Sequence, residues 1–168
     1  RHVENQATAH RALDSARCVP VSYTHLRAHE TVLDLVCRLL LEKKKKIKIL
    51  SDKEAVELWL KGKDAWNEWV LANPKYSIDF GNVDFSGHNL VSFEQFNFPD
   101  GRVSFYNAQF GEGDVNFIGA QFGEGYVNFM GAQFGEGNVD FSYAQFGESN
   151  VYFSYAQFGE GNVSFQHV

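Results

Sequence analysis

Residues 115 to 162 consist of four nearly identical blocks of twelve residues. They read VNFIGAQFGEGY (115–126), VNFMGAQFGEGN (127–138), VDFSYAQFGESN (139–150) and VYFSYAQFGEGN (151–162). Each block holds two five-residue units with Phe at the third position, followed by a two-residue insert. A short fixed period is typical of a solenoid, in which each repeat buries its apolar face only against its neighbours. The repeat therefore predicts a stacked coil.

The alternation within each unit indicates which side chains point inward. In the first block, Val115 and Phe117 lie two residues apart, as do Ala120 and Phe122. Residues two apart on a strand face the same side, so we expect these four side chains in the interior. Gly and Asn follow at the turns, where they adopt backbone conformations that other residues find costly.

The pattern is less regular before the four blocks. Residues 78–82, 83–87 and 88–92 read IDFGN, VDFSG and HNLVS, with no insert between them. Residues 94–102 are irregular, and order resumes at Val103. This alignment predicts inward positions for the first and third residues of each unit, His88 among them.

Two of the twelve-residue blocks make one 24-residue coil with four sides, and four units without inserts make a 20-residue coil. The 24-residue coil predicts two stacks of rings about 4.8 Å apart, the usual spacing of hydrogen-bonded strands. These stacks are Phe105, Phe129, Phe153 and Phe117, Phe141, Phe165. A twelve-residue coil is the competing geometry. It would enclose two Phe, one Val and one Ala in a very thin tube, so we prefer the larger coil.

The pattern resembles the bacterial pentapeptide-repeat family, in its Phe-rich variant. The matching positions are the Phe centres and the small residue two before every second centre: Phe117, Phe122, Phe129, Phe134, Phe141, Phe146, Phe153, Phe158, Ala120, Ala132, Ala144 and Ala156. Residues 62–69 (GKDAWNEW), continuing through Asn73-Pro74, resemble a leader common before such repeats. The resemblance covers about residues 50–168 and implies a right-handed four-sided β-helix, a mainly β fold. The two-residue inserts and the irregular segment 93–102 depart from the family pattern.

Residues 48–75 are predicted to form one helix that caps the solenoid, which occupies residues 76–168. Ser51 to Glu54 read as a capping box, and Asn73-Pro74 stops the helix. Gly62 weakens its centre, which makes a bend there an open alternative. One apolar face is expected from Val56, Trp59, Leu60, Trp66, Trp69 and Val70. The tryptophans form either a binding stripe or a cover for the open end of the solenoid. We favour the cover, because solenoids need caps.

Residues 1–47 allow three interpretations. Residues 31–46 have helical spacing and end in a lysine run, which is typical of a short amphipathic helix. A basic anchor for an acidic membrane surface is the functional interpretation. The third is that VSYTHLRAHET and LVCRLLLEKKKK, within residues 21–46, resemble a translated sequencing adapter followed by an adenine run. We favour this artefactual origin, so Cys18 and Cys37 carry no conclusion about disulfides.

The ends and the apolar content bear on the chain's location. The sequence begins with Arg1 and ends in mid-repeat at residues 163–168, so we expect the natural protein to extend beyond both ends. No apolar run approaches the roughly 18 to 20 residues of a membrane span. No secretory signal is visible, and a cytoplasmic location is the default expectation.

Charge divides the chain. Residues 78–168 contain eleven acidic residues and one basic residue, a net of −10, whereas residues 1–77 contain ten acidic and fourteen basic residues, a net of +4. The two values sum to the chain's −6. A net of −10 would repel phosphates, and no basic patch relieves it, so direct nucleic-acid binding is not expected.

Five glutamates, each directly before an insert, fall in two columns on a 24-residue coil: Glu112, Glu136 and Glu160 in one, Glu124 and Glu148 in the other. One interpretation is a surface for cations or for a basic groove of a partner protein. The simpler interpretation is that exposed charge keeps a strand-rich surface from associating. The five glutamates are nevertheless the candidate partner-binding residues.

No motif of catalysis is present. The phosphate-binding G-x-x-x-x-G-K-[ST], the nucleophile motif G-x-S-x-G and the calcium-binding G-G-x-G-x-D pattern are all absent. We expect no catalytic residues, no cofactor and no metal.

The expected function is a non-enzymatic solenoid that binds an unknown protein partner or is structural, with a homodimer as an open alternative. The second candidate is a mimic of duplex DNA, since some members of the resembled family present carboxylates to DNA gyrase. An enzyme with an acid pair on one face is the least favoured class.

Overall fold

The computed structural model describes residues 48–148 and 150–168. Contacts divide the chain into residues 1–46 and 47–168, and all described residues belong to the second unit. The expectations for residues 1–47, the two cysteines included, therefore lie outside the described residues. No helix in the described part is long and apolar enough to cross a membrane.

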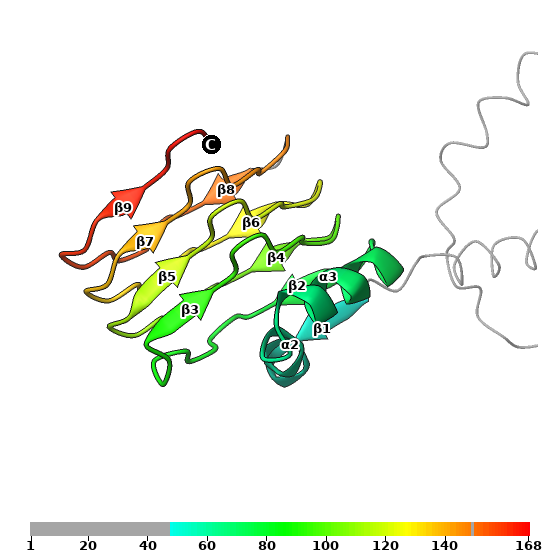
Figure 1. The fold of residues 1–168 in the computed structure, drawn as a ribbon, viewed down its shortest axis with the longest axis horizontal. Helices are drawn as coiled ribbons and strands as arrows, with labels where there is room; N and C mark the ends of the chain where they lie inside the picture. Colours follow the sequence, from blue (N-terminus) through cyan, green and yellow to red (C-terminus); the bar gives the residue numbers. More distant parts are fainter. Residues whose placement is uncertain (1–47, 149) are drawn as a thin grey trace, which may run out of the picture. The chain divides into compact units, whose positions relative to one another are not determined.

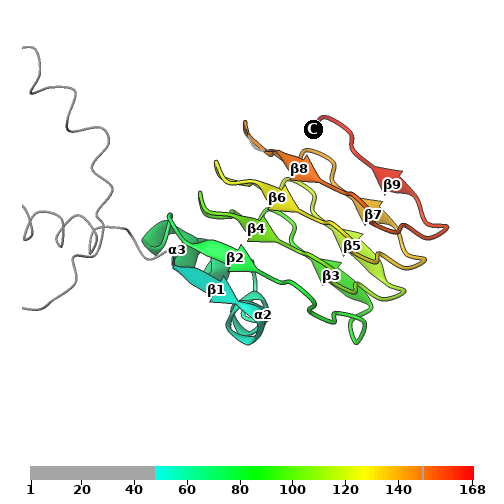
Figure 2. The same cartoon turned by 180° about the vertical axis from the view of Figure 1, so that it is seen from behind.

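Short strands stack in parallel in two sheets (Figure 1). The first sheet has the order β1 (Ile49–Ser51), β2 (Ser77–Asp79), β4 (Val103–Ser104), β6 (Val127–Asn128), β8 (Val151–Tyr152). The second has the order β3 (Leu90–Ser92), β5 (Asp114–Asn116), β7 (Val139–Asp140), β9 (Val163–Ser164). Sequence-consecutive strands alternate between the sheets from β2 onward, so the fold is a β-helix-like solenoid (Figure 2).

The strand register agrees with the larger of the two predicted coils. Val103 pairs with Val127, and Val115 pairs with Val139, so each partner lies two twelve-residue blocks further along the chain. A twelve-residue coil would have paired Val115 with Val127, so that competing geometry is wrong. Between the two sheets the chain also makes isolated parallel bridges, which form two further columns: Asp84, Gln109, Gln133, Gln157 and Asn97, Gln121, Gln145.

Phenylalanine rings fill the interior in vertical stacks. The two predicted stacks are confirmed: Phe105 lies 4.9 Å from Phe129, and Phe117 lies 4.8 Å from Phe141, with rings within 6° of parallel. Two more stacks run beside them, namely Phe85, Phe110, Phe134, Phe158 and Phe98, Phe122, Phe146. Neighbouring stacks meet edge to face, as Phe105 and Phe117 do at 87°. Offset and edge contacts of this kind are the favoured arrangements of aromatic pairs.

In most coils a polar residue between the inward Val and the inward Phe stabilises the turn that follows. The side-chain oxygen of Asn116 accepts a hydrogen bond from the backbone N–H of Ile118 at 2.8 Å. Asn128 does the same for Met130, at 2.9 Å. Asn, Asp and Ser favour such bonds to the backbone two residues on. The recurrent V-[ND]-F motif therefore forms part of a strand and also stabilises the following turn with its Asn or Asp.

The insert glycines are required where successive coils touch. A Cβ built on Gly137 would lie 2.1 Å from the carbonyl oxygen of Gly113, one coil earlier. The same atom on Gly125 would lie 2.3 Å from the carbonyl oxygen of Gly101. Backbones this close leave no room for a side chain at these two positions, and Gly opens the insert in each of the four blocks except the third, which has Ser149.

The prediction of a shorter first coil without inserts is wrong. Ile78 pairs with Val103, whereas Val103 pairs with Val127, so the first coil is one residue longer than the next. The extra length lies in the turn after Phe85, and the next inward pair is Val91 and Phe93, both buried. The alignment that placed His88 inward was wrong: His88 is exposed, and its ring rests edge-on against Trp59.

The segment predicted to be irregular is in fact one regular side of this coil. Phe96 and Phe98 are both buried, and Asn97 between them forms the bridge to Gln121. Phe96 occupies the position that Ala120 occupies one coil later. Because this position was expected to hold a small residue, the five-residue unit was not recognised in the sequence. The ring of Phe96 packs against Trp66 of the cap, with ring centroids 5.5 Å apart.

The cap differs from the single predicted helix. It consists of β1 and two helices, α2 (Asp52–Trp59) and α3 (Lys63–Ala72), separated at Gly62, whose φ is +88°. The predicted capping box is wrong, because Ser51 ends β1, is paired with Asp79 and makes no side-chain capping bond. Pro74 follows the end of α3 as expected.

The prediction that tryptophans cover the open end is confirmed for Trp59 and Trp66. Trp66 is fully buried and lies 5.9 Å from Phe80, which stacks on Phe105, so it forms the first ring of one stack. The Trp66 indole N–H donates to the carbonyl oxygen of Asn97 at 2.7 Å. The separate prediction of an apolar helix face fails at Leu60, which is 61% exposed, because the chain turns between the helices at this point.

Candidate functional site

The solenoid presents its chemistry on its outer surface. The five candidate glutamates are all exposed and lie in the two predicted columns. Gln109, Gln133 and Gln157 are bridged, which aligns the first column three residues further on: Glu112, Glu136 and Glu160. The Gln121–Gln145 bridge aligns Glu124 with Glu148 in the same way. The structure thus brings the glutamates together as two separate rows.

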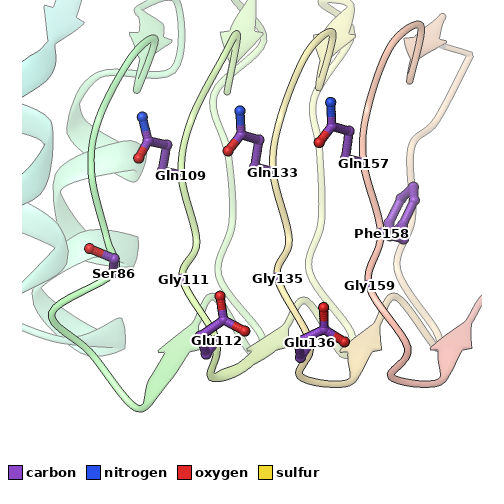
Figure 3. Close-up of a pocket in the computed structure, with 10 residues that line it drawn as sticks. All are labelled: Ser86, Gln109, Gly111, Glu112, Gln133, Gly135, Glu136, Gln157, Phe158 and Gly159. Carbon is purple, nitrogen blue, oxygen red and sulfur yellow. The ribbon is translucent and has the colours of Figure 1, made fainter.

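The first glutamate column borders a shallow groove of about 370 Å³ (Figure 3). Its lining repeats with the coil and consists of Ser86, Gln109, Gly111, Glu112, Gln133, Gly135, Glu136, Gln157, Phe158 and Gly159. Three glutamine side chains follow one another along it, with Glu112 and Glu136 in parallel below them. At the end of the column, the backbone N–H of Glu160 donates to Glu136 Oε2 at 3.0 Å. This lining offers hydrogen-bond donors and acceptors but pairs no nucleophile with a base.

The second column has different neighbours. Glu124 precedes Tyr126 by two residues, and Tyr126 lies beside Arg102, the one basic residue of residues 78–168. Arg102 Nη1 donates to the Tyr126 hydroxyl at 3.3 Å, and Nη2 lies 3.7 Å from Asp79 Oδ2. The hydrogen bond with Tyr126, aided by the Asp79 charge, raises the pKa of Arg102.

The aromatic row continues to Tyr152, whose ring lies 6.0 Å from that of Tyr126 at an interplanar angle of 79°. Sequence reasoning missed this row. The signal was available: on a 24-residue coil, Arg102, Tyr126 and Asn150 occupy equivalent positions, and so do Asn128 and Tyr152.

A second groove, of about 580 Å³, lies between α2 and the first coil. Asp52, Lys53 and Glu57 border it on the helix, and residues 81–84 border it on the coil. Hydrogen bonds from Ser86 lower the pKa of the Asp84 carboxyl, so this turn contributes stability above the carboxyl's ordinary pKa and loses it as pH falls further. Within residues 48–148 and 150–168, no group of three or more His, Cys, Asp and Glu side chains could hold a metal ion.

Comparison of the chain with models of protein families, with curated proteins and with solved structures found no match.

Proposed function

We propose that the solenoid is a closed, right-handed, four-sided coil of the pentapeptide-repeat type. Two sheets and two columns of isolated bridges supply four contact strips per coil. Four Phe stacks, one behind each strip, fill the space between them. An experimental structure of the chain tests this directly. A stack that is open on one side, with Phe122 and Phe146 in solvent, would contradict it.

We further propose that the protein is a non-enzymatic module that binds a protein partner or serves a structural role. This proposal rests on the interior, which is packed with Phe rings, so that only exposed side chains are available to contact a partner. Those side chains recur once per coil and are mainly carboxylates, amides and tyrosines. Such regular lateral surfaces are how solenoids bind extended partners.

Crosslinking capture from bacterial extract tests the proposal, with two matched variants. One replaces Glu112, Glu136 and Glu160 by Gln, and the other replaces Glu124 and Glu148 by Gln. A protein-binding role predicts one partner that the unmodified chain retains and that one of the variants loses. A partner retained equally by both variants would remove the glutamates from the proposed interface. A purely structural role predicts no specific partner.

The second candidate, mimicry of duplex DNA, is favoured by charge density. Residues 78–168 carry a net −10 over about four coils, or about one negative charge per 2 Å of axis at the usual strand spacing. Duplex DNA carries one per about 1.7 Å. This candidate predicts inhibition or protection of DNA gyrase in a supercoiling assay, lost on Glu124→Gln plus Glu148→Gln. Activity unchanged by the protein would exclude gyrase as the target.

A further inference from the structure

The two sheets display different outer surfaces although nearly identical repeats build them. On β5, β7 and β9 the residues flanking the inward Val are small and polar: Asp114, Asn116, Asn138, Asp140, Asn162 and Ser164. The equivalent positions beside β4, β6 and β8 include Arg102, Tyr126 and Tyr152. Tyr155 follows three residues after Tyr152. We call Arg102, Tyr126, Tyr152 and Tyr155 the tyrosine surface.

Contacts join Arg102, Tyr126 and Tyr152 of this surface into a row across successive coils, and Tyr155 belongs to it only by its place three residues after Tyr152. Asp79 holds Arg102, Arg102 donates to Tyr126, and Tyr126 packs edge-on against Tyr152. Tyr126 and Tyr152 remain 41% and 42% exposed. Each ring is therefore fixed by a neighbour while part of its surface stays open to solvent.

Stability does not account for two of these tyrosines. Tyr152 occupies the position at which Asp79 and Asn128 accept a backbone hydrogen bond two residues on. A phenol oxygen, held at the far end of a rigid ring, cannot make that turn bond. The residue therefore gives up a local interaction that equivalent coils retain.

Tyr155 has a backbone φ of +60° and is 86% exposed. The equivalent residues one and two coils earlier are Gly131 and Asn107, which suit the left-handed conformation. A bulky residue with positive φ is strained, and an exposed ring recovers little of the cost by burial. Tyr143, half a coil earlier in the same local sequence, has the same φ of +60°, so the strain is common to both copies and the position of Tyr155 beside the row distinguishes it.

The chemistry of the row indicates what it binds. Exposed tyrosine faces attract cations, and arginine stacks on them better than lysine because its guanidinium is planar and weakly hydrated. The net −10 of residues 78–168 attracts a cationic partner and repels both phosphates and a second copy of the same surface. Arg102 itself shows a guanidinium seated in the row, between a carboxylate and a phenol.

We propose that the tyrosine surface docks an extended, arginine-rich segment of a protein partner, with Glu124 and Glu148 supplying carboxylates at its edge. This inference rests on the protein-binding function proposed above. It specifies the chemical character of the partner, and it gives the second glutamate column a role in binding that the first column does not have.

Fluorescence anisotropy with a labelled, alternating Arg–Gly peptide at about 50 mM NaCl tests the inference, because surface attraction is still strong at that ionic strength. We expect saturable binding by the full chain, weaker binding of the equally charged Lys–Gly peptide, and a rise in Kd of about 5- to 30-fold on Tyr126→Ala plus Tyr152→Ala. Tyr143→Ala, which removes an exposed ring from a turn of the other sheet, is the matched control and should leave Kd unchanged. Tyr155→Asn suits the local backbone and keeps the test valid if the double variant does not fold.

Equal Kd values for the two peptides that the tyrosine substitutions do not change would mean that net charge alone explains the binding. That result would overturn the inference. Tyrosine-dependent self-association in sedimentation velocity would overturn it as well, since the occupant would then be a second copy. A captured protein partner that the tyrosine variants retain contradicts this inference but leaves protein binding intact. Absence of any peptide or protein ligand contradicts this inference and the protein-binding role, and leaves the structural role as the proposed function.

Discussion

Phe residues at different positions of one stack contribute unequally to the stability of the protein. Phe117 is fully buried and has rings on both sides, Phe93 at 4.9 Å and Phe141 at 4.8 Å. Phe165, in the same stack, has a ring on one side and is 45% exposed. The same side chain therefore makes a different contribution in the middle of the stack and in its last described layer.

We expect Phe117→Ala to lower the free energy of unfolding by about 3–5 kcal/mol, since it removes a buried ring and leaves a cavity. Phe165→Ala should cost about 1–2 kcal/mol, because much of that ring is already in water. Urea titration followed by circular dichroism measures both. Equal losses for the two variants would mean that the stack does not distribute its stability in this way.

Tyr155 allows a substitution that stabilises the protein. Tyr155→Asn should raise the free energy of unfolding by about 0.5–1 kcal/mol, because Asn tolerates the positive φ better than Tyr does. Tyr155→Ala is the control: it removes the ring but keeps an unfavourable residue in the left-handed conformation, so it should give no gain. Thermal denaturation distinguishes the pair. A stabilised Ala variant would locate the effect in the ring and not in the backbone.

At the scale of elements, the insert turns set how closely coils can approach. Gly137→Ala should destabilise the protein by about 1–3 kcal/mol, because its methyl group would overlap the Gly113 carbonyl oxygen and force the backbones apart. Gly87→Ala is the matched control, since a Cβ there meets nothing within 4 Å, and it should change stability by less than about 0.5 kcal/mol. Denaturant midpoints for the two variants provide the comparison. A tolerated Ala at 137 would show that the coils can separate at no cost.

The regular elements could be predicted from the sequence, and the first coil could not. Four blocks of identical spacing determined the register of β5 to β9 and the stacks beneath them. In the first coil, one additional residue after Phe85 shifts the inward positions from His88 and Leu90 to Val91 and Phe93. A single copy gives no period against which such a shift can be detected, and Phe96 at a small-residue position obscured it further.

The cap shows a second limit of pattern reasoning. Helical spacing identified Trp59 and Trp66, and the aromatic content indicated a cover for the open end. Pairing of β1 with β2 joins residues far apart in sequence, and no local pattern in Ile49–Ser51 reports it. Ser51 precedes α2 with the extended backbone usual at that position, yet its side chain makes no capping bond, so the capping box that the local sequence favoured does not form.

At the scale of the whole solenoid, the charge is a constraint on stability. Glu112, Glu136 and Glu160 recur on adjacent coils, at a strand spacing of about 4.8 Å. That spacing is shorter than the Debye length of about 10 Å at 0.1 M salt, so the carboxylates repel one another at low ionic strength. The candidate site could be predicted to this extent: the glutamate columns followed from the 24-residue period, and the same period placed Arg102 and Tyr126 at equivalent positions, but only the structure shows that Tyr126 contacts Tyr152.

Raising NaCl from about 10 mM to about 300 mM should therefore raise the melting temperature, because screening weakens the repulsion within the columns. The variant with Gln at positions 112, 136 and 160 should start from a higher melting temperature at low salt and respond less. Differential scanning calorimetry at matched pH measures both effects. An identical salt response of the two proteins would show that the column repulsion is negligible.

The pairing of every second block also restricts how such a chain can change length over generations. One twelve-residue block spans half a coil, so the loss or gain of a single block transfers every later side chain to the opposite sheet, and tyrosines would exchange places with asparagines and aspartates. Duplication or deletion of two blocks at once adds or removes a layer and leaves each later residue above its former neighbours. Lineages that depend on one lateral surface should therefore differ in length by even numbers of blocks.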